Sequence, residues 1–75
     1  MELKDDQDFQ KFIILLDHWI KHNDEHSVEY TNWAQKLEAA GYTEVSRHLK
    51  SASELLHQSN QEFFKAKTIL ETSRT

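Results

Sequence analysis

Ala40-Gly41-Tyr42-Thr43 is the stretch that decides the fold, because it holds the only glycine of a 75-residue chain without proline. Glycine often follows the last residue of an α-helix, since it adopts a left-handed conformation at little steric cost. A hydroxyl side chain such as that of Thr43 favours the start of the next helix. The stretch therefore predicts a turn at residues 41–43 between two helices.

Regular apolar spacing flanks this turn on both sides. Acidic residues at positions 5, 6 and 8 favour a helix N-terminus just before the pattern begins. Intervals of three and four residues then alternate through Phe9, Phe12, Leu16, Trp19, Asn23, His26, Tyr30, Trp33, Leu37 and Ala40. The same alternation continues after the turn through Val45, Leu49, Ala52, Leu56, Ser59, Phe63, Ala66 and Leu70. We expect helices over about 6–40 and 44–72, within one helical domain covering residues 1–75.

The predicted fold is all-α, an antiparallel helical hairpin. The first apolar stripe keeps its phase through His22-Asn23-Asp24-Glu25, where neither glycine nor proline interrupts the chain. This favours one long helix before the turn. The alternative is a three-helix bundle with a break near Asn23, in which Asn23 or Asp24 caps a new helix.

A hairpin of this size has a modest core, because two helices bury only one line of side chains between them. Further apolar residues lie beside or behind the two stripes: Ile13, Ile14, Leu15, Ile20, Leu55, Phe64 and Ile69. Pairing two hairpins would bury these side chains in a four-helix bundle. We therefore expect a homodimer.

Charge and composition exclude several classes of function. Nine basic and thirteen acidic residues give a net charge of −4, which disfavours binding to nucleic acid or to an anionic membrane. The chain has no apolar run of about 18 residues and no signal-peptide pattern, so we expect a cytoplasmic protein. No catalytic triad or glycine-rich phosphate loop is recognisable, so we expect no enzyme activity.

Histidine is the one residue type that points to chemistry. His18, His22 and His26 recur every fourth residue, which places them on one side of a helix where neighbours can bind the same metal ion. Folding at Gly41 places Glu62 level with His22. The predicted metal ligands are therefore His22 and His26, helped by Glu62 and His18, and this ligand chemistry suits nickel, cobalt or zinc.

A polar layer across the hairpin has a second explanation. Asn23 and His26 interrupt the first apolar stripe and Ser59 interrupts the second, and the fold brings these interruptions to the same level. Hydrogen bonds between such residues fix the register and oligomeric state of helical bundles. The protein would then be a helical oligomerisation module, or one that binds a partner protein's helix. Protonation of a buried histidine in this layer would instead make a pH switch.

The stretch from Leu16 to His26 reads L-D-H-W-I-K-H-N-D-E-H, with Trp33 and Gly41 further along the chain. This pattern resembles a small helical domain family of anaerobic bacteria and archaea, written L-x-H-W-I-x-H-N-x-E-H. Its members are sometimes associated with nickel-binding accessory proteins of carbon monoxide dehydrogenase maturation. The resemblance implies a link to nickel or cobalt handling.

Overall fold

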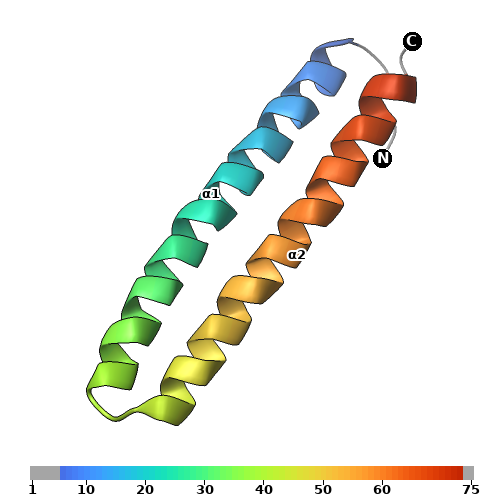
Figure 1. Ribbon diagram of the computed structural model, residues 1–75. Coiled ribbons are helices and arrows are strands. Elements are labelled where there is room, and N and C mark those ends of the chain that lie inside the picture. The colour runs from blue at the N-terminus through green and yellow to red at the C-terminus, as the bar shows by residue number, and fades with distance from the viewer. Residues whose placement is uncertain (1–5, 74–75) are drawn as a thin grey trace.

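The computed structural model describes residues 6–73, which form two long helices packed antiparallel as a hairpin (Figure 1). Helix α1 spans Asp6–Ala39 and helix α2 spans Thr43–Ser73. The molecule measures 54 × 19 × 16 Å, so its length is close to that of α1 alone. The predicted all-α hairpin is confirmed. Within residues 6–73, neither helix has the length and hydropathy of a segment that crosses a membrane.

Helix α1 begins and continues as its sequence indicates. Asp6 and Asp8 lie in its first turn, whereas Asp5 lies outside the described residues. The helix runs without a break through Asn23, which rules out the three-helix alternative. Asn23 and Asp24 do not cap a new helix, because their side chains bond instead to Asn60 on α2.

The turn between the helices has the geometry of a Schellman motif. Gly41 has a φ of 94°, in the left-handed region that favours glycine. The amide of Gly41 donates to the carbonyl of Glu38 at 3.0 Å, and the amide of Tyr42 donates to that of Leu37 at 2.8 Å. The Tyr42 carbonyl in turn accepts from the amide of Ser46 at 3.0 Å, so the first helical bond of α2 begins one residue before Thr43.

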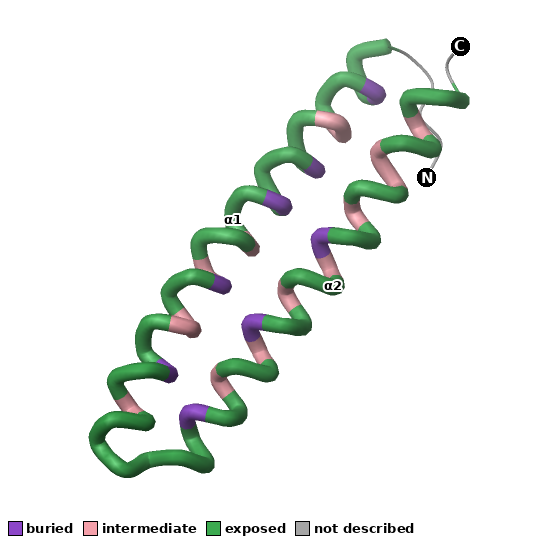
Figure 2. The backbone as a smooth tube through the Cα atoms, in the orientation of Figure 1, coloured by how far each residue is buried: buried purple, intermediate pink, exposed green. Residues whose placement is uncertain are grey.

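The residues that face the opposite helix follow one regular line on each helix (Figure 2). On α1 the central line is Phe9, Ile13, Leu16, Ile20, Asn23, Ser27, Tyr30, Ala34 and Leu37, and Phe12, His26 and Thr31 beside it are half-buried. On α2 the central line is Ser46, Leu49, Ser53, Leu56, Asn60, Phe63, Lys67 and Leu70, and Ala52, Ser59 and Ala66 beside it are half-buried. Every second member agrees with the predicted stripe. Of the predicted positions between these members, Trp19, Trp33, Ala40 and Val45 are exposed, whereas the others are half-buried: Phe12, His26, Ala52, Ser59 and Ala66.

At three positions, the larger side chain is exposed and its smaller neighbour in the sequence is buried. Trp19 and Trp33, predicted to be core residues, are 38% and 54% exposed, whereas Ile20 and Ala34 are buried. Val45 is likewise exposed, and its neighbour Ser46 is buried. An indole ring does not fit directly between two closely packed helices, so the tryptophans lie along the edge of the interface.

Candidate functional site

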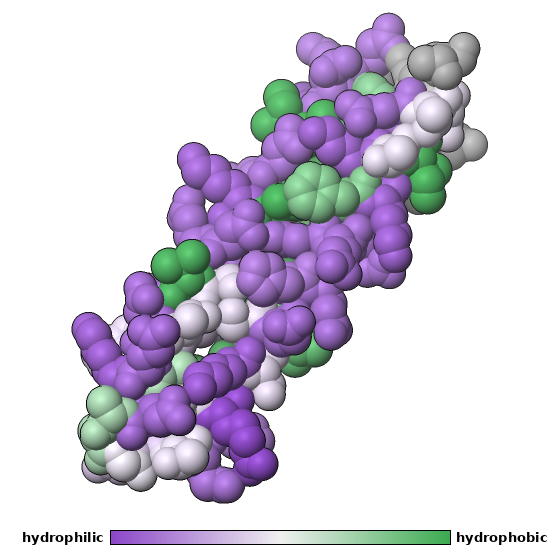
Figure 3. Space-filling view, in the orientation of Figure 1, coloured by the Kyte–Doolittle hydropathy of each residue, from purple (hydrophilic) through white to green (hydrophobic). Residues whose placement is uncertain are grey.

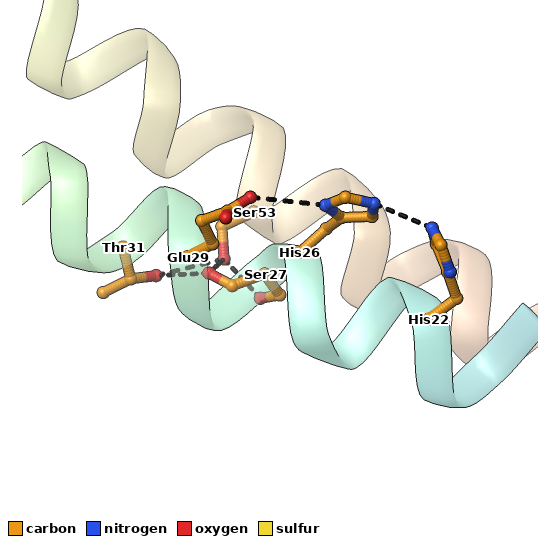
Figure 4. A network of polar contacts seen from close by, with 6 residues as sticks. All are labelled: His22, His26, Ser27, Glu29, Thr31 and Ser53. Carbon is orange, nitrogen blue, oxygen red and sulfur yellow. Dashed lines mark hydrogen bonds and ion pairs between the residues drawn. The ribbon is translucent and has the colours of Figure 1, made fainter.

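His22 and His26 come together on the surface of α1. Their Nε2 atoms lie 2.8 Å apart, and their ring centroids 4.5 Å apart (Figure 4). The cause is local, because side chains four residues apart are stacked one turn apart on a helix. His18 continues the row, with its ring centroid 5.8 Å from that of His22. His18 and His22 are exposed, and His26 is half-buried.

The second ring nitrogen of His26 faces a carboxylate. Glu29 Oε1 lies 3.5 Å from His26 Nδ1, on the side of the ring opposite His22 (Figure 4). Tyr30 stacks on the imidazole of His26 at a centroid distance of 5.8 Å and an interplanar angle of 25°. These neighbours on α1 hold the His26 ring so that its Nε2 atom points along the helix toward His22.

Glu62 does not join the histidines. Its Oε2 atom lies 3.4 Å from the ammonium group of Lys65, one turn away on α2. Around His18 and His22, a shallow pocket of about 100 Å³ is lined also by Lys21 and Glu25. Across residues 6–73 no three His, Cys, Asp or Glu side chains form a group that could hold a metal ion. Within one chain, the structure thus brings His22 and His26 together but does not bring Glu62 to them.

Asn60 is the centre of a buried hydrogen-bond network between the helices. Its side-chain amide donates to the backbone carbonyl of Ile20 at 3.0 Å and to the carboxylate of Asp24 at 2.9 Å. Its carbonyl oxygen accepts from the amide of Asn23 at 3.0 Å. Asn23 and Asn60 thus lie at the same level of the hairpin, where hydrogen bonds join the two helices.

A second group of hydrogen bonds lies one turn closer to Gly41. The hydroxyl groups of Ser27 and Ser53 lie 2.5 Å apart, and Ser53 also donates to the Ser27 carbonyl at 3.2 Å (Figure 4). Thr31 contacts both, through the Ser27 carbonyl and the Ser53 hydroxyl. From α2, His57 Nε2 reaches the Ser27 hydroxyl at 3.1 Å.

The sequence did not lead us to predict this second group of hydrogen bonds. The predicted stripes contain the residues immediately before Ser27 and Ser53, not these two serines. A signal for them does exist in the sequence. Small or polar residues lie seven positions apart at Ser27 and Ala34 on α1, and at Ser46, Ser53 and Asn60 on α2. A seven-residue repeat of small side chains marks the line where two helices approach closely.

A shallow groove of about 370 Å³ runs beside the asparagine network. It is lined by His18, Trp19, His22, Asn23, Leu56, Ser59 and Phe63. The indole of Trp19 contacts the ring of Phe63 across the groove, with centroids 5.7 Å apart. Trp19, His22 and Ser59 therefore lie on the same side of the hairpin, although they come from different helices.

This side of the hairpin is rich in exposed apolar side chains, and we call it the apolar face. It consists of the edge positions 12, 19, 26 and 33 on α1 and 45, 52, 59 and 66 on α2, together with the residues three positions after each of them, among which several are polar or charged. Its exposed large members are Leu15, Trp19, Trp33, Val45, Leu55 and Ile69. In the view of Figure 3, apolar residues reach the surface in several places along the hairpin, between hydrophilic ones. His22 and His26 lie midway along the apolar face.

The open end of the hairpin is joined by an ion pair. Lys67 Nζ lies 2.7 Å from Asp17 Oδ1, and these residues come from opposite helices. The pKa of the Lys67 ammonium is raised above its usual 10.5, chiefly because it donates this hydrogen bond to Asp17. The pair supports the register set by Asn60 and takes no part in the histidine row.

A comparison with known families identifies the chain. The family model named domain of unknown function DUF8180 matches residues 12–70, which include the turn and most of both helices. The chain belongs to the DUF8180 family. No curated protein and no solved structure matches it. The DUF8180 domain of this chain is thus a hairpin of two helices.

Proposed function

We propose that this protein is a non-catalytic helical module that associates with a second copy of itself through the apolar face. The exposure of that face is the observation that carries the proposal. Six of the ten exposed large hydrophobic residues found within residues 6–73 lie on it. An exposed apolar surface of this kind marks an interaction site on a protein.

The interior of one hairpin explains why a second copy is needed. Among the described residues, the buried apolar side chains are only Phe9, Leu16, Ile20 and Ala34, and the other buried positions carry serine or asparagine. A chain of this length rarely gains enough stability from one such line of contacts. Burying the apolar face against another hairpin would complete a four-helix bundle.

The arrangement of the apolar face favours a second copy over an unrelated partner. Trp19 and Trp33 lie seven residues to either side of His26 on α1. On α2, His57 lies at about the same level, since it bonds to Ser27, and Val45 and Ile69 lie twelve residues to either side of it. A two-fold axis at this level would place Trp19 of one copy level with Trp33 of the other, and Val45 level with Ile69. The apolar face would thus be complementary to itself.

Analytical ultracentrifugation over a wide range of protein concentration tests this proposal. We expect the wild type to be a dimer and Trp33→Glu to weaken the dimer by roughly 2 kcal/mol or more, since it places a charge in the interface. Val28→Glu is the matched control, because Val28 is similarly exposed but lies outside the apolar face. A monomeric wild type, or equal dissociation of both variants, would contradict the proposal.

Transition-metal binding, with nickel, cobalt or zinc, is the second candidate function. The convergence of His22 and His26 supports it, because their Nε2 atoms are 2.8 Å apart. The resemblance of the stretch from Leu16 to His26 to a family associated with nickel accessory proteins supports it as well. Glu62 and His18 enter this candidate only if they move, because Glu62 pairs with Lys65 in the structure.

A further inference from the structure

The groove beside the asparagine network has the lining of a pocket for a flat apolar side chain. Its volume is about 370 Å³, and the rings of Trp19 and Phe63 and the side chain of Leu56 form its apolar walls. Ser59 also lines it, with a hydroxyl oxygen that can accept a hydrogen bond. An indole combines a flat apolar body with a single N–H donor, so it suits both parts of this lining.

Trp33 carries an exposed indole on the same apolar face. Its exposed fraction is 54%, compared with 38% for Trp19. The ammonium group of Lys36 lies 5.0 Å from the centre of the Trp33 ring, and this cation–π contact orients the indole on α1. A side chain that is already oriented loses less conformational entropy when it binds. Tryptophans of this kind contribute much of the binding energy of protein interfaces.

Trp33 does not reach the groove of its own chain. The groove includes Trp19, which precedes Trp33 by fourteen residues on α1. This separation corresponds to about 21 Å along the helix axis. A contact between Trp33 and the groove therefore requires a second copy of the chain.

The two-fold axis described above brings Trp33 of the second copy to the groove. An axis at the level of His26 places this residue level with Trp19 of the first copy. Side chains on an α-helix lean toward the N-terminus of the helix. The indole therefore leans toward Tyr30 of its own chain, which the axis places level with His22, and His22 lines the groove.

The size and charge of the apolar face fit this arrangement. The hairpin extends over 54 × 19 Å, roughly 1,000 Å², and a stable interface buries about 800 Å² on each partner. The acidic residues of the apolar face are Glu29 and Glu62. The axis places Glu29 level with Asn23 of the second copy. It places Glu62 level with Ala52 of the second copy, so carboxylates do not oppose one another.

We infer that Trp33 of each copy inserts into the groove between Trp19 and Phe63 of the other copy. The inference rests on the proposed self-association through the apolar face, and it names the contact that fixes how the two copies align. Because the axis is two-fold, the dimer contains two such contacts. The groove is thus a binding site for an indole of a second copy of this chain.

Ultracentrifugation of single and double variants tests the insertion. Trp33→Ala should raise the dissociation constant of the dimer by about 30-fold or more, as expected for a tryptophan that fills a pocket. Phe64→Ala is the matched control, because Phe64 is 53% exposed but lies outside the apolar face. Ser59→Phe fills the groove with a ring of its own chain and should also weaken the dimer. Trp33→Ala should then cause little further loss, and additive losses would overturn the insertion.

Isotope-filtered NMR of dimers that mix labelled and unlabelled chains detects the contact directly. A nuclear Overhauser effect between the Trp33 indole and the Phe63 ring is expected between copies. A dimer without this effect, or equal dissociation of Trp33→Ala and Phe64→Ala, overturns the insertion and leaves self-association standing. A monomer at all concentrations overturns both proposals. Circular dichroism of each variant verifies that the hairpin still folds.

Discussion

Asn23 Nδ2 donates a hydrogen bond to Asn60 Oδ1 at 3.0 Å, joining residues 37 positions apart at the middle of the two helices. Asn60 uses its amide group at the same time to bond the Ile20 carbonyl and the Asp24 carboxylate. A shift of one helix along the other would break all three bonds and leave buried polar groups without partners. The pair therefore sets the register of the hairpin, and so the level at which the histidines lie.

Asn60→Ala should lower the free energy of unfolding by about 1–3 kcal/mol, because it leaves the Asn23 amide and the Ile20 carbonyl without their partner. Urea denaturation followed by circular dichroism measures this change. The double variant Asn23→Leu/Asn60→Leu removes both polar partners and should recover stability, but with a mixture of oligomeric states. An Asn60→Ala protein as stable as the wild type would remove the register role of the pair.

Ser46→Ala should stabilise the protein. The Ser46 hydroxyl oxygen is buried and has no hydrogen-bond partner in the structure, and such a group costs about 1–3 kcal/mol. Ser51→Ala is the control, because Ser51 is an exposed serine on the same helix and reports helix propensity alone. Thermal unfolding should show a larger gain for Ser46→Ala than for Ser51→Ala, and equal gains would refute this explanation.

Gly41→Ala should destabilise the hairpin by about 1–2 kcal/mol, the cost of a left-handed conformation for a residue with a Cβ atom. The cause is backbone strain alone, because an added Cβ atom meets nothing within 4 Å. Gly41→Asn should cost less, since asparagine tolerates this conformation better than alanine. Denaturant unfolding of the three proteins should rank them Gly, Asn, Ala, and a different order would point to a changed turn.

Alkaline pH should weaken the open end of the hairpin. The pKa of Lys67 is raised in the folded protein, chiefly by its hydrogen bond to Asp17, so the folded state binds this proton more tightly than the unfolded chain. The contribution is complete below pH 10.5 and is lost as the pH rises through the folded pKa. Unfolding measured on both sides of that pH should be less pH-dependent for Lys67→Met than for Lys65→Met, which removes an exposed lysine of α2.

The predicted stripes were correct at most positions of both helices, which are buried or half-buried in the structure. Leu16, Asn23 and Leu56 were assigned to the interface and lie in it, but Trp19 and Val45 were assigned to it and are exposed. The predicted stripe and the observed central line both alternate spacings of three and four residues, so they share every second position. On α1, hydrophobicity favoured the positions of the two tryptophans, whereas packing against α2 buries their smaller neighbours Ile20 and Ala34.

The candidate site was also predictable only in part. His22 and His26 converge because they are neighbours on one helix, a relationship that depends only on helical spacing. The ligand role of Glu62 and the partners of Ser27 depend on how α2 is rotated about its own axis. Glu62 pairs with Lys65, and Ser27 meets Ser53 and His57 across the interface.

The amino-acid order alone was sufficient to derive two helices, a turn at Gly41 and a row of histidines on one side of α1. These features follow from local rules, because helical periodicity and a left-handed glycine act within a few residues. Only the packing of the two helices decided which side of each helix is buried, since that choice depends on the space between them. It buries serines and Asn60 and leaves Trp33 exposed, so the apolar face is a consequence of tertiary packing.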